Sequence, residues 1–127
     1  MLCVFDETNP TPDLLFRAAL PGGGTCAGGP CWKSKGGDTF GYKNTAGSSE
    51  GLIQARLHAG AAASAVIKGK GVHLSDRAYP LPHPTLPTPL RVQLSGDGGF
   101  CAETHYLAGG VLKNDPVRGT FRARGAP

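Results

Sequence analysis

Two runs of alternating residues joined by a glycine-rich turn constrain the fold of this chain most strongly. They lie in LRVQLSGDGGFCAETHY, residues 90–106. Leu90, Val92 and Leu94 alternate with polar residues, as in a strand with one buried face. The sequence GDGG, residues 96–99, then supplies the positive-φ positions of a tight turn, and residues 100–106 return with a similar pattern. This stretch therefore predicts a β-hairpin.

The same organisation recurs along the chain. Short apolar or alternating segments, separated by turns rich in Gly and Pro, predict strands over residues 2–5, 14–20, 38–43, 52–59 and 65–71. A helix is the alternative over residues 52–59, because Ser48 or Ser49 offers an N-cap. The clean period-two alternation and the flanking Gly51 and Gly60 favour a strand. The predicted fold is all-β: an antiparallel β-sandwich built from hairpins.

The 127 residues predict one domain with a flexible end. Five of the 11 prolines fall in residues 79–90, which predicts a rigid crossover segment and argues against a central strand. The PxxP at 84–87 formally matches an SH3 ligand, but the rigid crossover is the favoured interpretation. After residue 107 the periodicity is lost and basic residues dominate. We expect a module over residues 1–114 and a flexible basic tail over 115–127, whose deletion from Pro116 on leaves stability nearly unchanged.

Four cysteines in a small chain rich in Gly, without CxxC spacing, favour disulfides over a zinc site. Four cysteines allow three pairings. We favour Cys26 with Cys31, which closes a short Gly- and Pro-rich loop beside Trp32, and Cys3 with Cys101, which ties the first strand to the hairpin at 90–106. The longer loop predicts about 4 kcal/mol of stabilisation in the chain-entropy model. Disulfides also predict a secreted, periplasmic or cell-surface location.

The N-terminal residues carry no export signal, and no stretch is long enough for a transmembrane span. A chain that needs an oxidising compartment without such a signal is expected to be part of a longer exported protein. The net charge is +4, with five basic and five acidic residues in 1–63, and eight and four in 64–127. This mild excess, without interleaved aromatic residues, makes nucleic acid an improbable partner and solvated surface the simplest interpretation.

Few residues suggest chemistry. Glu103 and His105 lie two apart in a predicted strand, so they share a face and form an acid–base or ligand pair, or an ordinary exposed pair, which is the favoured interpretation. The other histidines are scattered, and no spacing matches a metal site, a phosphate-binding loop or a nucleophile elbow. We therefore expect no enzyme activity, no metal and no cofactor.

Three segments together carry a resemblance. CAGGPCWKSKGGDTFGYKN, the later KGKG with its Leu- and Pro-rich sequel, and TPLRVQLSGDGGFCAETHY occur in this order over most of residues 2–114. The chain thereby resembles an uncharacterised, disulfide-containing C-terminal β module of predicted secreted bacterial proteins. Ala102 stands where that family often has Trp. The resemblance implies an extracytoplasmic accessory module and no catalytic residue.

Two functions remain open. The favoured one is a non-catalytic structural or surface-association module, whose partner is a cell-surface polymer, a polysaccharide or a neighbouring protein domain. The alternative is a carbohydrate-binding module in which exposed Tyr42, Tyr79 or Tyr106 stacks against sugar rings. A cluster of exposed aromatic side chains on one sheet distinguishes the second from the first.

Overall fold

The chain folds into two compact units, each with its own four-stranded sheet. The computed structural model describes residues 1–61, 64–69, 85–96, 98–99, 101–115 and 120–123. The first unit comprises Met1–Ala18 and Ser75–Pro127, and the second comprises Ala19–Leu74. The structure thus divides the single module expected over residues 1–114.

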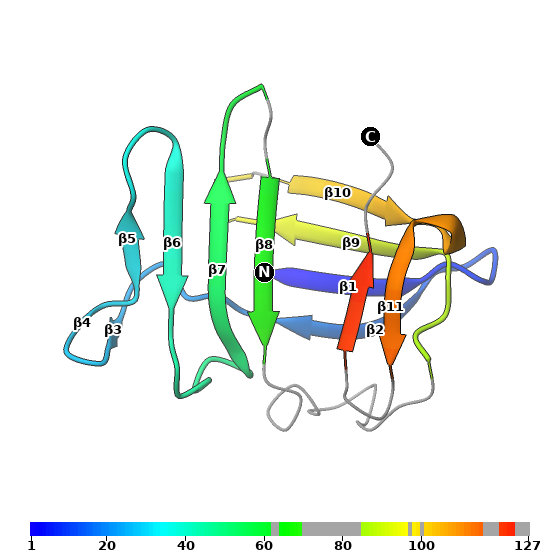
Figure 1. Cartoon of the computed structure of the whole chain (residues 1–127), viewed down its shortest axis with the longest axis horizontal. Coiled ribbons are helices and arrows are strands. Elements are labelled where there is room, and N and C mark those ends of the chain that lie inside the picture. The colour runs from blue at the N-terminus through cyan, green and yellow to red at the C-terminus, as the bar shows by residue number, and fades with distance from the viewer. Residues whose placement is uncertain (62–63, 70–84, 97, 100, 116–119, 124–127) are drawn as a thin grey trace. The chain divides into compact units, whose positions relative to one another are not determined.

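The first unit contains β1 (Leu2–Asp6), β2 (Asp13–Ala18), β9 (Leu90–Ser95) and β10 (Cys101–Tyr106), in the order β10-β9-β1-β2. Every neighbouring pair is antiparallel, and Figure 1 shows these strands running side by side. The hairpin predicted over residues 90–106 is confirmed, and the strands predicted over residues 2–5 and 14–20 pair as a second hairpin. The strand from the N-terminus pairs with β9 as well as β2, so the two hairpins form one sheet.

One face of this sheet carries the apolar core of the first unit. Val4, Leu15 and Leu90 are buried in contact with one another, and partly buried side chains surround them. Those surrounding residues are Phe16, Leu86, Val92 and Tyr106. The period-two pattern that predicted the strands sends the intervening residues, such as Arg91 and Gln93, to the opposite face.

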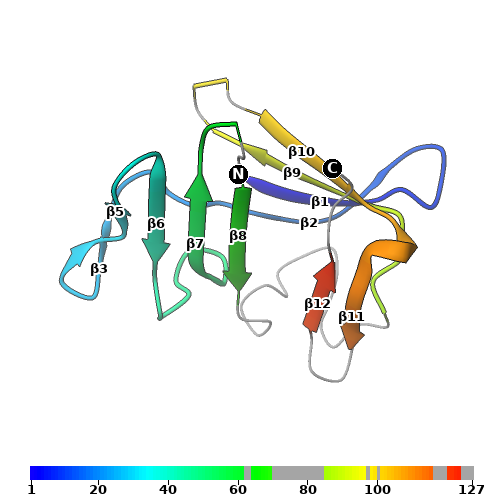
Figure 2. The same ribbon diagram turned by 45° about the horizontal axis from the view of Figure 1, so that its top comes forward.

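The C-terminal part of the first unit contains a separate two-stranded sheet. A short 3-10 turn, Ala108–Gly110, leads into β11 (Val111–Asp115), which pairs antiparallel with β12 (Thr120–Ala123). Figure 2 shows this separate hairpin. Asn114 anchors it, because its side chain exchanges hydrogen bonds with the backbone of Leu86: Leu86 N–H to Oδ1 at 3.0 Å, and Nδ2 to the Leu86 carbonyl at 2.8 Å. Residues 120–123 of the tail expected over 115–127 thus form a strand, and the flexibility of that tail stays a prediction.

The second unit contains β5 (Trp32–Ser34), β6 (Thr39–Lys43), β7 (Leu52–His58) and β8 (Ser64–Gly69), paired antiparallel in that order. The strand interpretation of residues 52–59 is confirmed against the helix. Ser49 bridges to Leu52 around Glu50 and Gly51, which both have positive φ. Glu50 is held there because its carboxylate accepts a hydrogen bond from Ala19 N–H at 2.6 Å.

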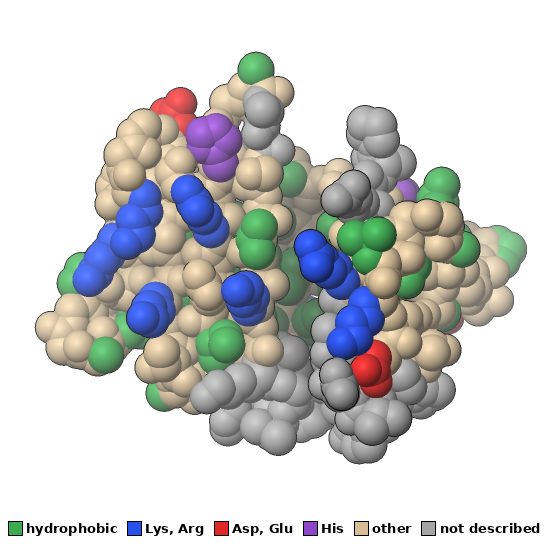
Figure 3. Space-filling model, in the orientation of Figure 1, with side chains coloured by type: hydrophobic (Ala, Val, Ile, Leu, Met, Phe, Trp, Pro, Cys, Tyr) green, Lys and Arg blue, Asp and Glu red, His purple; other side chains and the backbone are tan. Residues whose placement is uncertain are grey.

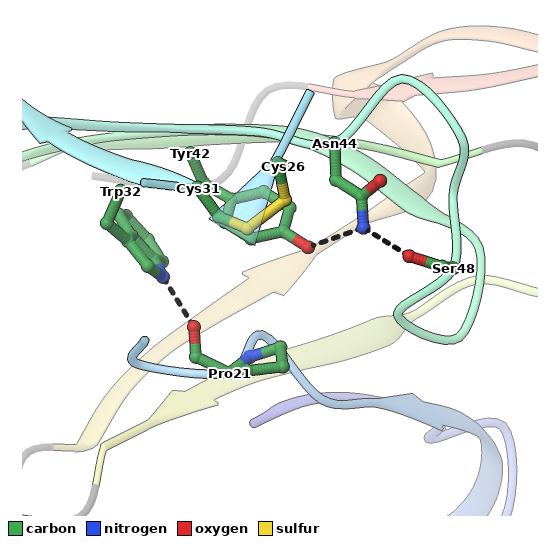
Figure 4. The surroundings of a disulfide bond; sticks show 7 residues. All are labelled: Pro21, Cys26, Cys31, Trp32, Tyr42, Asn44 and Ser48. Atoms are coloured by element: carbon green, nitrogen blue, oxygen red, sulfur yellow. Dashed lines mark hydrogen bonds between the residues drawn. A yellow bond between two sulfur atoms is a disulfide. The ribbon is translucent and has the colours of Figure 1, made fainter. Parts of the chain in front are cut away.

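A small covalently closed hairpin, β3 (Thr25–Cys26) and β4 (Gly29–Pro30), precedes this sheet. The predicted Cys26–Cys31 disulfide is confirmed. Tyr42 and Ala55 are buried together with Cys31, and Trp32 packs at their edge, with its ring centroid 5.3 Å from that of Tyr42. Figure 4 shows Trp32 Nε1 donating to the Pro21 carbonyl at 2.7 Å. Disulfide and aromatic pair therefore form one core.

The second predicted disulfide is wrong. Cys3 and Cys101 are both free thiols, half-buried and exposed respectively. Strand β9 lies between their strands: Cys3 pairs in register with Gln93, and Cys101 with Ser95. Strands separated by one neighbour lie about 9.6 Å apart, beyond the reach of a disulfide at about 7 Å between Cα atoms.

Apart from the 3-10 turn, no helix occurs in the described ranges, so the predicted all-β class is confirmed. The sheets are built from antiparallel hairpins, as predicted, and this organisation is compatible with a sandwich. None of the described helical structure has the length and apolar character to cross a membrane. Most of the Pro-rich crossover, including Tyr79, lies outside the described residues.

Reduction of the protein is expected to have a moderate effect, smaller than the sequence analysis implied. Only a five-residue separation is closed by the Cys26–Cys31 bond, which corresponds to about 2 kcal/mol in the chain-entropy model. Denaturant unfolding followed by Trp32 fluorescence, with and without reductant, measures this loss. A Cys3→Ser/Cys101→Ser variant should show the same loss, because those thiols are free; a smaller loss in that variant would contradict the assignment.

Candidate functional site

One face of the second unit's sheet gathers basic side chains. Lys33 pairs with Gly41, and Gly41 with Arg56, so Lys33 and Arg56 share a face. On the same face Lys43 pairs with Gln54, and Gln54 with Lys68. We call the following set the basic face: Lys33, Lys35, Lys43, Arg56 and Lys68. Figure 3 shows Lys and Arg side chains spread over these strands.

A glycine makes room for one of these cations. The side chain of Lys35 crosses Gly41 so closely that a Cβ added there would lie 3.2 Å from Lys35 Cε. The aliphatic stem of Lys35 thus covers the bare backbone of β6, while its charged end extends beyond the glycine. A residue with a side chain at position 41 would displace it.

The carboxylates of the described residues leave the positive charge of the basic face unpaired. In the part of the second unit that the structure describes, the acidic residues are Asp38 and Glu50. Glu50 is engaged by the backbone of Ala19. Among the described residues, no carboxylate lies within ion-pair distance of any basic-face residue. Like charges on one sheet face repel each other, so this arrangement favours an anionic partner.

A groove of about 790 Å³ lies between this face and the β3–β4 hairpin. Residues 26–31 of the hairpin line one side, and the other side is lined by strands β5 to β7 and the loop after β6. Lys33, Lys35, Lys43 and Arg56 all line it, and no acidic residue does. The groove is therefore a cationic depression, and Gln54 adds a polar side chain to its lining.

The hairpin that forms the groove wall is fixed in two ways. Its turn residues Ala27 and Gly28 have φ values of 50° and 81°, the pattern of a type I′ turn, which suits a two-residue hairpin. This positive φ is sterically unfavourable for Ala27, because alanine has a Cβ atom. The disulfide and the Cys31 N–H hydrogen bond to the Gly24 carbonyl, at 3.1 Å, hold the strand ends in place. This wall is rigid because the chain is closed covalently.

In the first unit, the structure brings Glu103 and His105 together with a third residue, Glu7. His105 Nδ1 lies 2.8 Å from Glu7 Oε2, and Nε2 lies 3.0 Å from Glu103 Oε1. Arg91 approaches both carboxylates, with Nε 3.3 Å from Glu7 and Nη1 3.8 Å from Glu103. We call Glu7, Arg91, Glu103 and His105 the carboxylate–histidine cluster.

The geometry of this cluster favours one protonation state. A neutral imidazole has a single N–H, so it can donate to only one of two flanking carboxylates, whereas the imidazolium donates to both. The hydrogen bonds with Glu7 and then Glu103 raise the pKa of His105 above its ordinary value. A hydrogen bond from Gln93, followed by that from His105, lowers the pKa of Glu103. The cluster is thus a set of paired charges on an exposed sheet face.

Carboxylates occupy both ring nitrogens of the histidine in this cluster. This leaves no free lone pair on His105 to take a proton from a substrate. Within the described residues, no group of three His, Cys, Asp or Glu side chains is arranged to hold a metal ion. The contacts connect the segment after β1 with β9 and β10.

The tyrosines proposed as a sugar-stacking platform are not exposed where the structure describes them. Tyr42 is only 1 % exposed, and its hydroxyl accepts a hydrogen bond from Asn44 Nδ2 at 3.2 Å. Tyr106 packs against the core of the first unit. Tyr79 lies outside the described residues. The stacking role predicted for Tyr42 is therefore wrong, because its side chain fills the core under the disulfide.

The stability of the first unit is expected to fall as the pH rises above about 6.5. The folded-state pKa of His105 is raised from 6.5, so its contribution is complete below that value and is lost as the pH rises through the folded-state pKa. The pKa of Glu103 is lowered, so its contribution to the stability of the first unit is lost as the pH falls from 4.5 through its folded-state pKa. Thermal melts across this range measure both limbs. His105→Gln should flatten the upper limb, and an unchanged upper limb would contradict the pairing.

Neither the basic face nor the contact of Glu7 with His105 was predicted from the sequence. Counting charges by halves placed the excess after residue 63, yet Lys33, Lys35, Lys43 and Arg56 all precede it. Lys33 and Lys35 lie two apart in the sequence, but only the pairing of β5, β6 and β7 brings them onto one face with Lys43 and Arg56. Glu7 has no local signal either, because it meets His105 through the pairing of β1 with β9, which connects residues far apart in sequence.

Comparison with protein-family models, curated proteins and solved structures found no match to this chain.

Proposed function

We infer that this chain is a non-catalytic module that holds an exported protein on a surface, with the basic face as its contact. The observation that carries this proposal is the gathering of five cations on one sheet face without a carboxylate in ion-pair distance among the described residues. Such a field attracts anionic groups and accelerates their association.

The covalent structure supports an extracytoplasmic setting. A short-loop disulfide is compatible with an oxidising compartment, where such bonds persist. The resemblance of the CAGGPCWKSKGGDTFGYKN segment to a module of secreted bacterial proteins points the same way. Export and attachment within a longer protein are part of the proposal.

Two of the three tyrosines expected to bind carbohydrate by ring stacking are not exposed. Ring stacking needs an exposed aromatic face, and neither Tyr42 nor Tyr106 offers one in the place expected. Recognition by charge rather than by ring stacking is therefore the favoured mode.

A retention assay tests the proposal. Changing all five basic-face residues to Gln should weaken binding of the chain to an insoluble bacterial cell-surface fraction at least about fivefold, since exposed ion pairs contribute about 0.2–1 kcal/mol each. Retention of the unchanged chain should fall as salt is added.

The control is a Glu103→Gln/His105→Ala variant, which should be retained like the unchanged chain. Equal retention of the five-residue variant and the unchanged chain would overturn the role of the basic face. Hydrolysis of a substrate by the unchanged chain, lost in the Glu103/His105 variant, would overturn the non-catalytic assignment.

A further inference from the structure

We propose that the groove beside the β3–β4 hairpin is the binding site, and that its ligand is a segment of an acidic polysaccharide. This inference rests on the proposed surface association and assigns its ligand class and its position. Lys33, Lys35, Lys43 and Arg56 line the groove, whereas Lys68, on the same face, does not.

The residue types in the groove select for repeated, loosely positioned anions. Lysine is a compact point charge on a flexible stem, whereas planar, bidentate recognition of a single phosphate or carboxylate uses arginine. The groove has three lysines and one arginine among its lining residues. The amide of Gln54, also in the lining, can both donate to and accept from sugar hydroxyls.

Nucleic acid fits the groove less well. Proteins that bind single strands combine basic grooves with exposed aromatic side chains on which bases stack. Trp32 and Tyr42 pair across β5 and β6 on the face opposite Gly41, and Phe40 alternates onto that same opposite face. Tyr42 is the aromatic residue in the lining of the groove, and at 1 % exposure it offers no ring face for stacking. Charge without a stacking surface suits a glycan chain better than bases.

A protein partner also fits less well. Stable protein interfaces are centred on large apolar or aromatic anchors. The apolar residues that line the groove are small, namely Ala27, Pro30, Ala55 and the Cys26–Cys31 disulfide, except for Tyr42, which is only 1 % exposed. An acidic polysaccharide needs no such anchor, because its carboxylate or sulfate groups supply the attraction.

Two pairs of substitutions that remove the same charge test the position of the site. Lys33→Gln/Arg56→Gln removes two groove cations, and Lys113→Gln/Arg122→Gln removes two from the β11–β12 hairpin. The probes are polygalacturonate, dextran sulfate, uncharged dextran and oligo(dT), with binding measured by calorimetry at low salt. The groove pair should weaken binding to the acidic glycans about tenfold, at up to about 1 kcal/mol for each contact, while the control pair changes it less than about twofold.

A charge-neutral variant separates a built site from diffuse attraction. Gly41→Val adds a side chain beside Lys35 in the groove and leaves the net charge unchanged; β-branched residues suit a strand. We expect it to weaken glycan binding several-fold while the melting temperature stays close to that of the unchanged chain. Binding to both charged glycans shows that the anionic chain is recognised, and a preference for one identifies carboxylate or sulfate as the natural group.

Three results would overturn the inference. Equal losses in the groove and control pairs would mean diffuse attraction without a site, and tighter binding of oligo(dT) than of either glycan would assign the groove to nucleic acid. Retention on the cell-surface fraction without binding to any acidic glycan would remove the ligand class while leaving the proposed surface association intact.

Discussion

Replacing Tyr42 by Ala should destabilise the second unit by about 3–5 kcal/mol, the range for removing a large buried aromatic side chain. Tyr42 is among the most completely buried side chains described, at 1 % exposure, and it packs between the Cys31 sulfur, Ala55 and the Trp32 ring. Its removal leaves a cavity beside a disulfide whose short loop resists collapse. A domain of this size is stable by only about 5–15 kcal/mol, so this variant is expected to be close to unfolding.

The matched control is Tyr42→Phe, which keeps the ring and removes only the hydroxyl. Asn44 Nδ2 then loses one acceptor and keeps the other, Ser48 Oγ at 2.9 Å. We expect a loss of about 1 kcal/mol, as for a typical single hydrogen bond. Trp32 is the only tryptophan and lies in the second unit, so its fluorescence during urea unfolding reports on that unit. A loss below about 1 kcal/mol in Tyr42→Ala would place the ring outside the core and restore the stacking hypothesis.

Local patterns predicted the hairpins because their information lies in adjacent residues. The turn at residues 96–99 and the alternation around it specify both strands and their register. The helix alternative for residues 52–59 fails for the same reason: the alternation matches a strand with Ala55 buried and Arg56 exposed. Each of these decisions needed only a short window of sequence.

The pairing of distant strands could not be predicted in this way. The expected Cys3–Cys101 bond assumed that β1 lies beside β10, but β9 intervenes, and nothing in either segment specifies that order. For the same reason the contact between Glu7 and His105, which crosses β9, could not be predicted. It also hid the β11–β12 hairpin, whose anchor is a contact between Asn114 and Leu86.

Side-chain exposure was harder to predict than strand position. Phe40 and Tyr42 lie two apart on one face of β6, yet Phe40 is 47 % exposed and Tyr42 is buried. The difference follows from their partners. Tyr42 lies opposite Trp32 and Ala55 and under the disulfide, whereas Phe40 lies between Ser34 and Leu57 towards the end of the strand pair. Alternation identifies a face, but the neighbours that cover it come from elsewhere in the chain.

Leu90→Ala is expected to destabilise the first unit by about 2–5 kcal/mol, the range for truncating a buried leucine. Leu90 is 1 % exposed and contacts Val4 and Leu15, so it joins the N-terminal hairpin to β9 in one core. The truncation removes apolar contacts that hold together strands far apart in sequence. Its effect should therefore extend to β1 and β10 as well as β9.

The matched control is Leu14→Ala on β2, the same substitution in the same sheet at a side chain that is 43 % exposed. We expect a change within about 0.5 kcal/mol. Trp32 does not report on the first unit, so amide hydrogen exchange of β1, β9 and β10 is the suitable measurement. Leu90→Ala should accelerate exchange in all three strands together, because they share the Val4–Leu15–Leu90 core. Faster exchange confined to β9, or equal effects of the two substitutions, would show that Leu90 does not join the two hairpins.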